Sequence, residues 1–103
     1  MKQFSIRYIL ENIKYFQGCL YLKDLPWTLD MEGFFYVEDI DISPEEEEKI
    51  QKKFSDNGWQ STLYKEDIED VISNTCAQLK FPLISQFFDA FVFFFENDAF
   101  KEW

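Results

Sequence analysis

The stretch PLISQFFDAFVFFFENDAF, residues 82–100, is the most aromatic part of the chain, and the fold must form around it. It contains seven of the thirteen phenylalanines. Apolar residues cover most of the circumference of a helix with this sequence, which indicates a central helix enclosed by a sheet and other helices. The alternative is a partly exposed aromatic groove that receives a partner, and both can hold for different sides of the helix.

The segment just before it, KEDIEDVISNTCAQL (residues 65–79), predicts a second helix. Its apolar and small residues recur at the i, i+3, i+4, i+7 spacing of an amphipathic helix. They are Ile68, Val71, Ile72, Thr75, Cys76 and Leu79. Pro82 separates this helix from the aromatic one, since proline cannot continue a helix interior.

A third helix has the clearest start signal in the chain. Ser43 can cap it, Pro44 suits the first helical position, and Glu46 completes a Ser-x-x-Glu capping box. We expect it to end at Asn57-Gly58. Because only Ile50 and Phe54 provide apolar side chains, most of its circumference should face water.

The N-terminal part predicts one more helix and two strands. Ser5 is a candidate cap for a helix that runs through Phe16 to Gly18. Residues 19–23 alternate as a strand does, and residues 34–40 are rich in aromatic and β-branched residues, as strands are. An antiparallel pair across a loop of about ten residues follows, although two strands alone make a marginal sheet.

These elements predict an α+β fold, with about four helices packed on a small antiparallel sheet. A chain of 103 residues corresponds to a single compact domain, residues 1–103, with one core. Two distant cysteines, Cys19 and Cys76, indicate free thiols in a reducing compartment. The charged N-terminus lacks the apolar stretch of a signal peptide, and no apolar run is long enough to span a membrane. We therefore expect a cytoplasmic protein.

The net charge of −10 lies in one region of the chain. Residues 30–70 contain 14 acidic and 4 basic residues, a sum of −10, whereas the remainder contains 6 of each. A field of this sign repels nucleic acid and anionic membranes and attracts cationic partners. The acidity is therefore a regional property that points to a basic partner.

The residues present exclude several kinds of catalytic and metal site and make others less well supported. The absence of histidine removes the Ser-His-Asp and Cys-His nucleophile systems and most zinc sites. Asp39, Asp41 and Ser43 match the first ligands of an EF-hand loop, but Pro44 replaces its glycine and Ile50 its glutamate. We expect no catalytic residue, metal or cofactor, although a small hydrolase with paired carboxylates stays open.

Helix-start chemistry explains only part of the acidity. Carboxylates in a first helical turn interact favourably with the helix dipole and keep a phenylalanine-rich domain soluble. That does not account for the acids before residue 43 or those that open the next helix. We therefore predict a partner-binding surface, with Trp27, Trp59, Tyr36 and Tyr64 as candidate aromatic anchors or core residues. Its residues are Asp30, Glu32, Glu38, Asp39, Asp41, Glu45, Glu46, Glu48, Trp59, Glu66, Asp67 and Asp70.

Four segments carry a resemblance to a known family: FSIRYILENI (4–13), LYLKDLPWTLD (20–30), YKEDIEDVISN (64–74) and FVFFFENDAFKEW (91–103). Together they resemble the small acidic immunity proteins encoded beside polymorphic toxins, in particular those of contact-dependent growth inhibition systems. The resemblance implies an α+β, non-enzymatic protein that binds and neutralises a cognate toxin domain. That domain would be the C-terminal part of a large secreted effector and a nuclease, with a ribonuclease preferred.

The predicted function is therefore a bacterial antitoxin whose acidic surface, between residues 30 and 70, covers a basic nuclease active site. The alternative is an acidic adaptor or nucleic-acid mimic that binds another basic protein. Neither reading involves binding to nucleic acid or membrane. The sequence leaves monomer and dimer open, since Phe100 and Trp103 could support a second contact.

Overall fold

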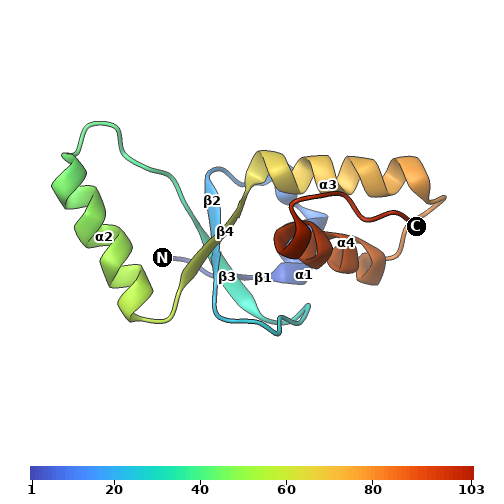
Figure 1. The fold of residues 1–103 in the computed structure, drawn as a ribbon, viewed down its shortest axis with the longest axis horizontal. Coiled ribbons are helices and arrows are strands. Elements are labelled where there is room, and N and C mark those ends of the chain that lie inside the picture. The colour runs from blue at the N-terminus through green and yellow to red at the C-terminus, as the bar shows by residue number, and fades with distance from the viewer.

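The chain folds into a four-stranded antiparallel sheet with helices on both of its faces (Figure 1). The computed structural model describes all residues, 1–103. The strands are β1 (Phe4–Ser5), β2 (Cys19–Leu22), β3 (Glu32–Tyr36) and β4 (Gln60–Tyr64), in the spatial order β1-β3-β2-β4. The helices are α1 (Ile6–Glu11), the 3-10 turn η1 (Ile13–Tyr15), α2 (Pro44–Asp56), α3 (Lys65–Gln78) and α4 (Ile84–Asn97). The predicted α+β class, with four helices on a small antiparallel sheet, is confirmed.

The sheet has helices α1, α3 and α4 on one face and α2 alone on the other (Figure 1). Strand β2 lies between β3 and β4 and is buried along its whole length. Successive side chains of a strand point to opposite faces. Leu20 and Leu22 accordingly pack with the three helices, whereas Cys19 and Tyr21 pack toward α2.

Two hydrophobic clusters result, where the sequence predicted one core. The larger contains ten buried residues, drawn from α1, η1, β2, β4, α3, α4 and the loop that carries Trp27. The smaller contains Cys19, Tyr21 and Phe34, covered by Tyr36, Phe54 and Trp59. The prediction of one core was wrong because a sheet with both faces covered divides the apolar side chains between its two sides.

The predicted helix starts match the structure. The Ser5 Oγ accepts a hydrogen bond from the Tyr8 N–H at 3.1 Å, and the Ser43 Oγ accepts one from the Glu46 N–H at 3.2 Å. Helix α2 ends at the predicted position, with Asn57 as its C-cap, and α3 covers the predicted segment. No residue of α2 is fully buried, as its short apolar stripe predicted.

Some boundaries differ from the prediction. The first helix breaks at Asn12, where the backbone leaves helical geometry, and continues only as η1. Strand β3 stops at Tyr36, so residues 37–40 belong to a loop and not to a strand. The short edge strand β1 and the strand β4 were missed; β4 has one buried side chain, Leu63, and so lacks a strong apolar pattern.

The prediction that residues 82–100 form an enclosed central helix was wrong. Helix α4 lies on α1 and α3 and fully buries only Ala90 and Phe91. Its other phenylalanines are half-buried, because neighbours cover one side of the helix only. The alternative, a partly exposed aromatic helix, describes it better. No helix of the chain has the length and apolar content needed to cross a membrane.

Candidate functional site

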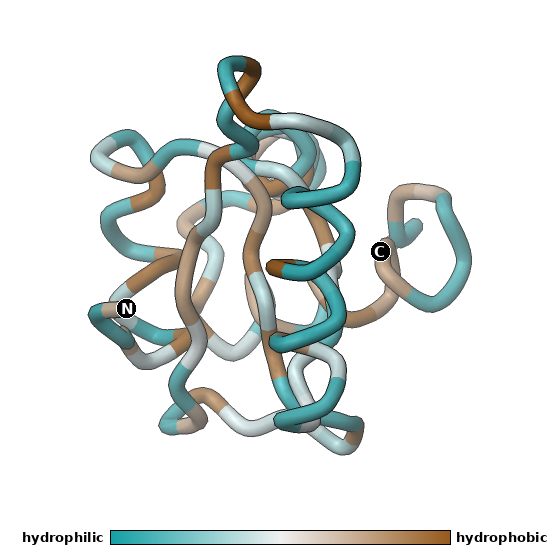
Figure 2. Tube along the Cα trace, turned by 90° about the vertical axis from the view of Figure 1, so that its left-hand side faces the viewer, coloured by the Kyte–Doolittle hydropathy of each residue, from teal (hydrophilic) through white to brown (hydrophobic).

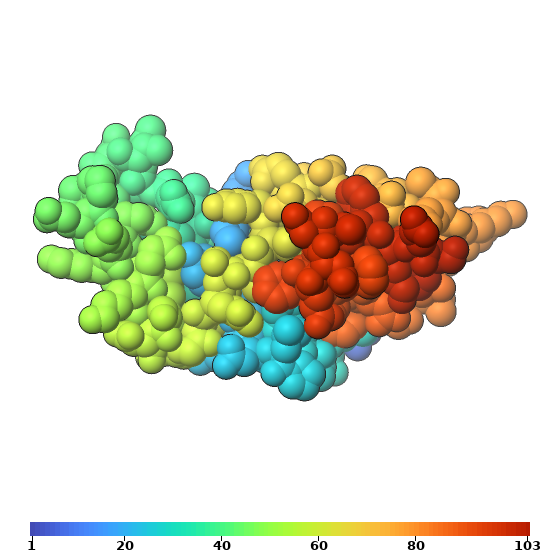
Figure 3. All heavy atoms as spheres, viewed as in Figure 1, coloured from blue at the N-terminus to red at the C-terminus, as the bar shows by residue number.

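An open groove separates α2 from the sheet. Its volume is about 420 Å³, within the usual range of ligand pockets. The walls come from β2, the end of β3, β4 and the inner side of α2, and Figure 3 shows the surface hollowed between α2 and the start of α3. The lining residues are Gly18, Cys19, Tyr21, Tyr36, Val37, Glu38, Glu47, Gln51, Ser61 and Tyr64. They include three tyrosines and two carboxylates but no basic residue.

A hydrogen-bond network crosses the gap between the sheet and α2. The Tyr36 hydroxyl donates to Glu47 Oε2 at 2.9 Å, and Gln51 Nε2 donates to Glu47 Oε1 at 2.8 Å. The Tyr21 hydroxyl donates to Gln51 Oε1. These bonds hold the Glu47 carboxylate in one orientation while each oxygen keeps a free lone pair. The groove therefore presents a positioned anionic group.

The backbone at the floor of the groove depends on a glycine. Gly18 has a φ of +93°, a conformation that side chains with a Cβ rarely adopt. A Cβ at this position would also collide with the carbonyl oxygen of Tyr36. Gly18 therefore allows the chain entering β2 to approach the end of β3 and open the groove beside it.

Burial and nearby carboxylates raise the pKa of three groups that line the groove. Burial raises the pKa of the Cys19 thiol, and the nearby carboxylates of Glu38 and Asp67 raise it further. Burial and the bond to Glu47 raise the pKa of Tyr36 to about 12. The pKa of Tyr64 is raised by Cys19 first, then by burial, Glu38 and Asp67. Each of these groups would gain a negative charge on ionisation, which both burial and the nearby negative groups oppose.

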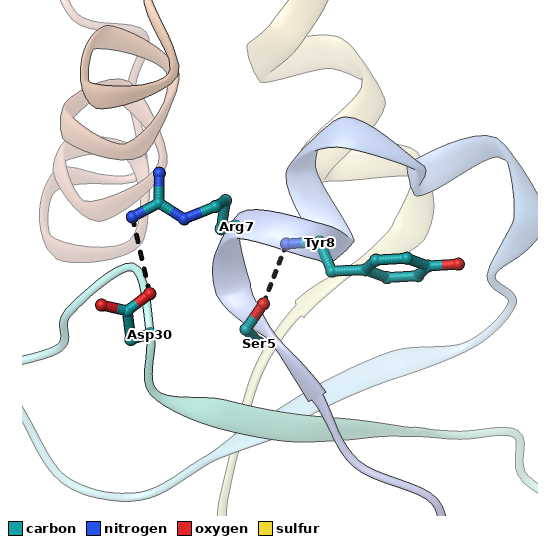
Figure 4. A network of polar contacts seen from close by, with 4 residues as sticks. All are labelled: Ser5, Arg7, Tyr8 and Asp30. Atoms are coloured by element: carbon teal, nitrogen blue, oxygen red, sulfur yellow. Dashed lines mark hydrogen bonds and ion pairs between the residues drawn. The ribbon is translucent and has the colours of Figure 1, made fainter.

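The acidic side chains lack internal counterions. The structure contains one ion pair, between Arg7 Nη2 and Asp30 Oδ1 at 3.5 Å, drawn in Figure 4 with the Ser5 cap of α1. The other 19 of the 20 acidic residues have no ion pair, and none of the lysines on α2 forms one. Uncompensated like charges repel one another and lower stability. Their negative field is therefore open to an external cation.

Several predicted site residues lie near the groove. Glu38, Asp39 and Asp41 belong to the loop between β3 and α2, and Glu38 lines the groove without any hydrogen bond or ion pair in the protein. The same loop exposes Ile40 almost completely, at 95%. Asp67, in the first turn of α3, accepts a hydrogen bond from the Tyr64 N–H at 3.2 Å. The loop thus combines carboxylates with an exposed apolar side chain.

The other predicted residues lie away from the groove lining. Asp30 and Glu32 stand at the opposite end of β3 from Tyr36. Trp59 is half-buried, packs edge-on against Phe34 at 4.8 Å between ring centroids, and has the Lys23 ammonium over its ring. The remaining acids are exposed to solvent on α2 and α3. They are Glu45, Glu46, Glu48, Glu66 and Asp70.

The apolar pattern of the sequence did not reveal the two residues of α2 that line the groove, Glu47 and Gln51. Glu47, Ile50, Gln51 and Phe54 are the only half-buried residues of this helix, and their spacing is i, i+3, i+4, i+7. Half of this stripe is polar, so a search for apolar residues found only Ile50 and Phe54. In Figure 2, α2 faces the viewer as an almost continuously hydrophilic helix.

The side chains of the groove can bind a ligand through charge, aromatic contact and hydrogen bonds. Carboxylates and tyrosine rings attract cations, and tyrosine and glutamine side chains provide hydrogen bonds. No group of three or more Cys, Asp or Glu residues in the chain is arranged to hold a metal ion. A cationic group is the ligand that these side chains match best.

Comparisons with known proteins place the chain in a family. It belongs to the family described as a domain of unknown function, DUF7716, whose model matches residues 3–103. Neither the curated proteins nor the solved structures contained a match to the chain. The family match covers the sheet and all the helices, and it assigns no function to them.

Proposed function

We propose that this protein is an immunity protein, which binds and neutralises a basic nuclease toxin domain, preferably a ribonuclease. The acidic groove and the loop beside it would cover the phosphate-binding surface of the nuclease. Carboxylates would then take the place of the phosphates of nucleic acid. The partner would be the C-terminal domain of a large secreted effector, as the resemblance to immunity proteins implies.

One observation carries this proposal: the negative charge near the groove has no counterion within the protein. Only Asp30 forms an ion pair, and it lies away from the groove lining. Complementary charge at an interface accelerates association and excludes wrong partners. An inhibitor of a toxic enzyme benefits from both, because the enzyme must be captured before it acts.

The loop between β3 and α2 supports a protein partner over a small ligand. Ile40, between Asp39 and Asp41, is 95% exposed, and Val37, just before Glu38, is 59% exposed. Protein interfaces commonly combine an apolar centre with a polar, charged rim. A basic protein with an apolar patch beside its active site would fit this arrangement.

The experiment is a protection assay with matched variants. The reading frame beside this gene is expected to encode a large secreted protein with a variable C-terminal domain, and that domain is expressed in cells with the immunity candidate. Wild type should protect the cells. The variant Glu38→Gln/Asp39→Asn/Asp41→Asn should protect the cells less than Glu45→Gln/Glu46→Gln/Glu48→Gln. The second variant also removes three negative charges, but from the exposed side of α2.

Two results would count against the proposal. One is full protection by both triple variants, which would mean that the acidic loop takes no part in inhibition. The other is a neighbouring gene without a toxin, together with binding to unrelated basic proteins. That result would favour the second candidate, an acidic adaptor that mimics nucleic acid, because both candidates rely on the same unpaired carboxylates.

A further inference from the structure

We infer that the groove between α2 and the sheet is a subsite for one arginine side chain of the partner. This inference rests on the proposed function and makes it more specific, because it names the group that the partner inserts. Glu38 and Glu47 would pair with the guanidinium, and Tyr36 and Tyr64 would contact its planar face and its aliphatic stem.

The groove has the size and composition for a cationic side chain and the backbone that carries it. It holds about 420 Å³, and its ten lining residues include two carboxylates, three tyrosines and a glutamine. No lysine or arginine of the protein lines it, so neither carboxylate has a cationic partner within the protein. A neutral or anionic occupant would cover these carboxylates without supplying a cation to balance their charge, which is unfavourable.

The carboxylates differ in how they are held. Glu47 is fixed by the bonds from Tyr36 and Gln51, and both of its oxygens retain acceptor capacity. Glu38 makes no bond within the protein and can adjust to the ligand. A fixed acceptor beside an adjustable one suits the forked donor set of a guanidinium, which forms several hydrogen bonds in one plane.

Aromatic rings favour arginine over lysine. Tyr21, Tyr36 and Tyr64 line the groove, and Tyr64 is 51% exposed with no hydrogen bond from its hydroxyl group. A guanidinium stacks on aromatic faces and is less strongly hydrated than an ammonium group.

The experiment uses small probes and the intact protein, without any toxin. The probes are N-acetyl-argininamide, N-acetyl-lysinamide and the uncharged N-acetyl-norleucinamide. Binding is followed by NMR of the tyrosine rings. Tyr21, Tyr36 and Tyr64 report on the groove, and Tyr8 and Tyr15 do not line it and serve as internal controls. The arginine probe should shift the groove tyrosines with saturation, and the uncharged probe should not.

Variants test the named residues. Glu38→Gln should lower the affinity for the arginine probe roughly two- to five-fold, the range for loss of one solvent-accessible charge pair. Glu48→Gln, an equal charge change outside the groove, should have no comparable effect. Tyr64→Ala should lower the affinity for the arginine probe by a similar factor, because a ring contact is lost, whereas Tyr15→Ala should not change it.

Three outcomes would overturn the inference. They are equal shifts at all five tyrosines, equal weakening by Glu38→Gln and Glu48→Gln, and lysine binding as tight as arginine binding. A toxin domain that binds while the arginine probe does not would refute the subsite and leave the proposed function intact. Saturable arginine binding with no toxin partner would support the subsite and count against the proposed function.

Discussion

The two faces of the sheet are built for different purposes. On one face, ten buried residues from nearly every element form a continuous core. On the other, three buried residues and three half-buried aromatics attach a hydrophilic helix, with a groove left open beside it. The difference indicates that the first face supplies most of the stability, while the second holds α2 and its acidic loop in position.

The largest expected effect lies on the first face. Phe91 is completely buried and packs against Trp27 at 5.4 Å between ring centroids. Phe91→Ala should lower the free energy of unfolding by about 3–5 kcal/mol, from lost burial and the cavity left behind. Urea unfolding measures this loss of free energy. Phe93→Ala is the matched control, because Phe93 lies on the same helix outside both hydrophobic clusters, and an equal loss there would contradict the assignment.

A smaller loss is expected on the second face. Phe54 is half-buried and contacts the rings of Tyr21, Phe34 and Tyr36 at 5.0–5.3 Å between centroids. Phe54→Ala should lower the free energy of unfolding by about 1–3 kcal/mol, less than Phe91→Ala.

Hydrogen exchange tests whether Phe54 holds α2 specifically. In Phe54→Ala, the amides of α2 should exchange faster while those of β2 and α3 stay protected, since local opening is set by local packing. Lys52→Ala, on the exposed side of α2, is the control. Uniform loss of protection throughout the chain would mean that the two faces are not separate units of stability.

The groove network predicts a pH effect confined to the second face. The pKa of Tyr36 is raised from 10.0 to about 12, with burial as the largest cause and the bond to Glu47 next, so the folded state holds this proton more tightly than the unfolded state does. Its contribution to stability is fully present below pH 10 and is lost as pH rises toward 12. Unfolding measured at pH 8, 10 and 11 should show a smaller decline for Tyr36→Phe than for wild type. For Tyr15→Phe, the free energy of unfolding should decline with pH as it does for wild type.

The smallest effect is expected from the unpaired acids. Like charges without counterions destabilise the folded state, and salt screens them. Raising NaCl from 0.05 to 0.5 M should therefore increase the free energy of unfolding, by about 1 kcal/mol or less as is usual for exposed charges. Urea unfolding measures this change, and the slope of the free energy against urea concentration should stay the same. A decrease with salt would mean that attractive pairs outweigh repulsion.

Elements with local sequence signals were predicted better than elements held by tertiary contacts. Helix α3 follows from the spacing of its apolar residues, and α2 follows from Ser43 and Pro44, because these signals are local. Strand β4 is held by pairing with β2 and has little pattern of its own. The prediction that α4 is enclosed was wrong because composition shows how apolar a helix is, and not how many neighbours cover it.

The candidate site was predicted in part. The acidic region was visible in the charge distribution, and Glu38 and Asp67 were among the predicted residues that act on the groove. Glu47 was left out, since a glutamate in a first helical turn is explained by the helix dipole. Tyr21 and Gln51 could not be found from the sequence, because their meeting depends on how α2 lies against β2, 30 residues away in the chain.

The central claim is that the acidic groove and loop capture a basic protein. The most direct test is the association rate between this protein and the toxin domain encoded beside it, measured from 0.05 to 0.5 M NaCl. The rate should fall about tenfold or more while the dissociation rate changes little, and Glu38→Gln/Asp39→Asn/Asp41→Asn should reduce that salt dependence. An association rate that is independent of salt, and unchanged in this variant, would contradict the account.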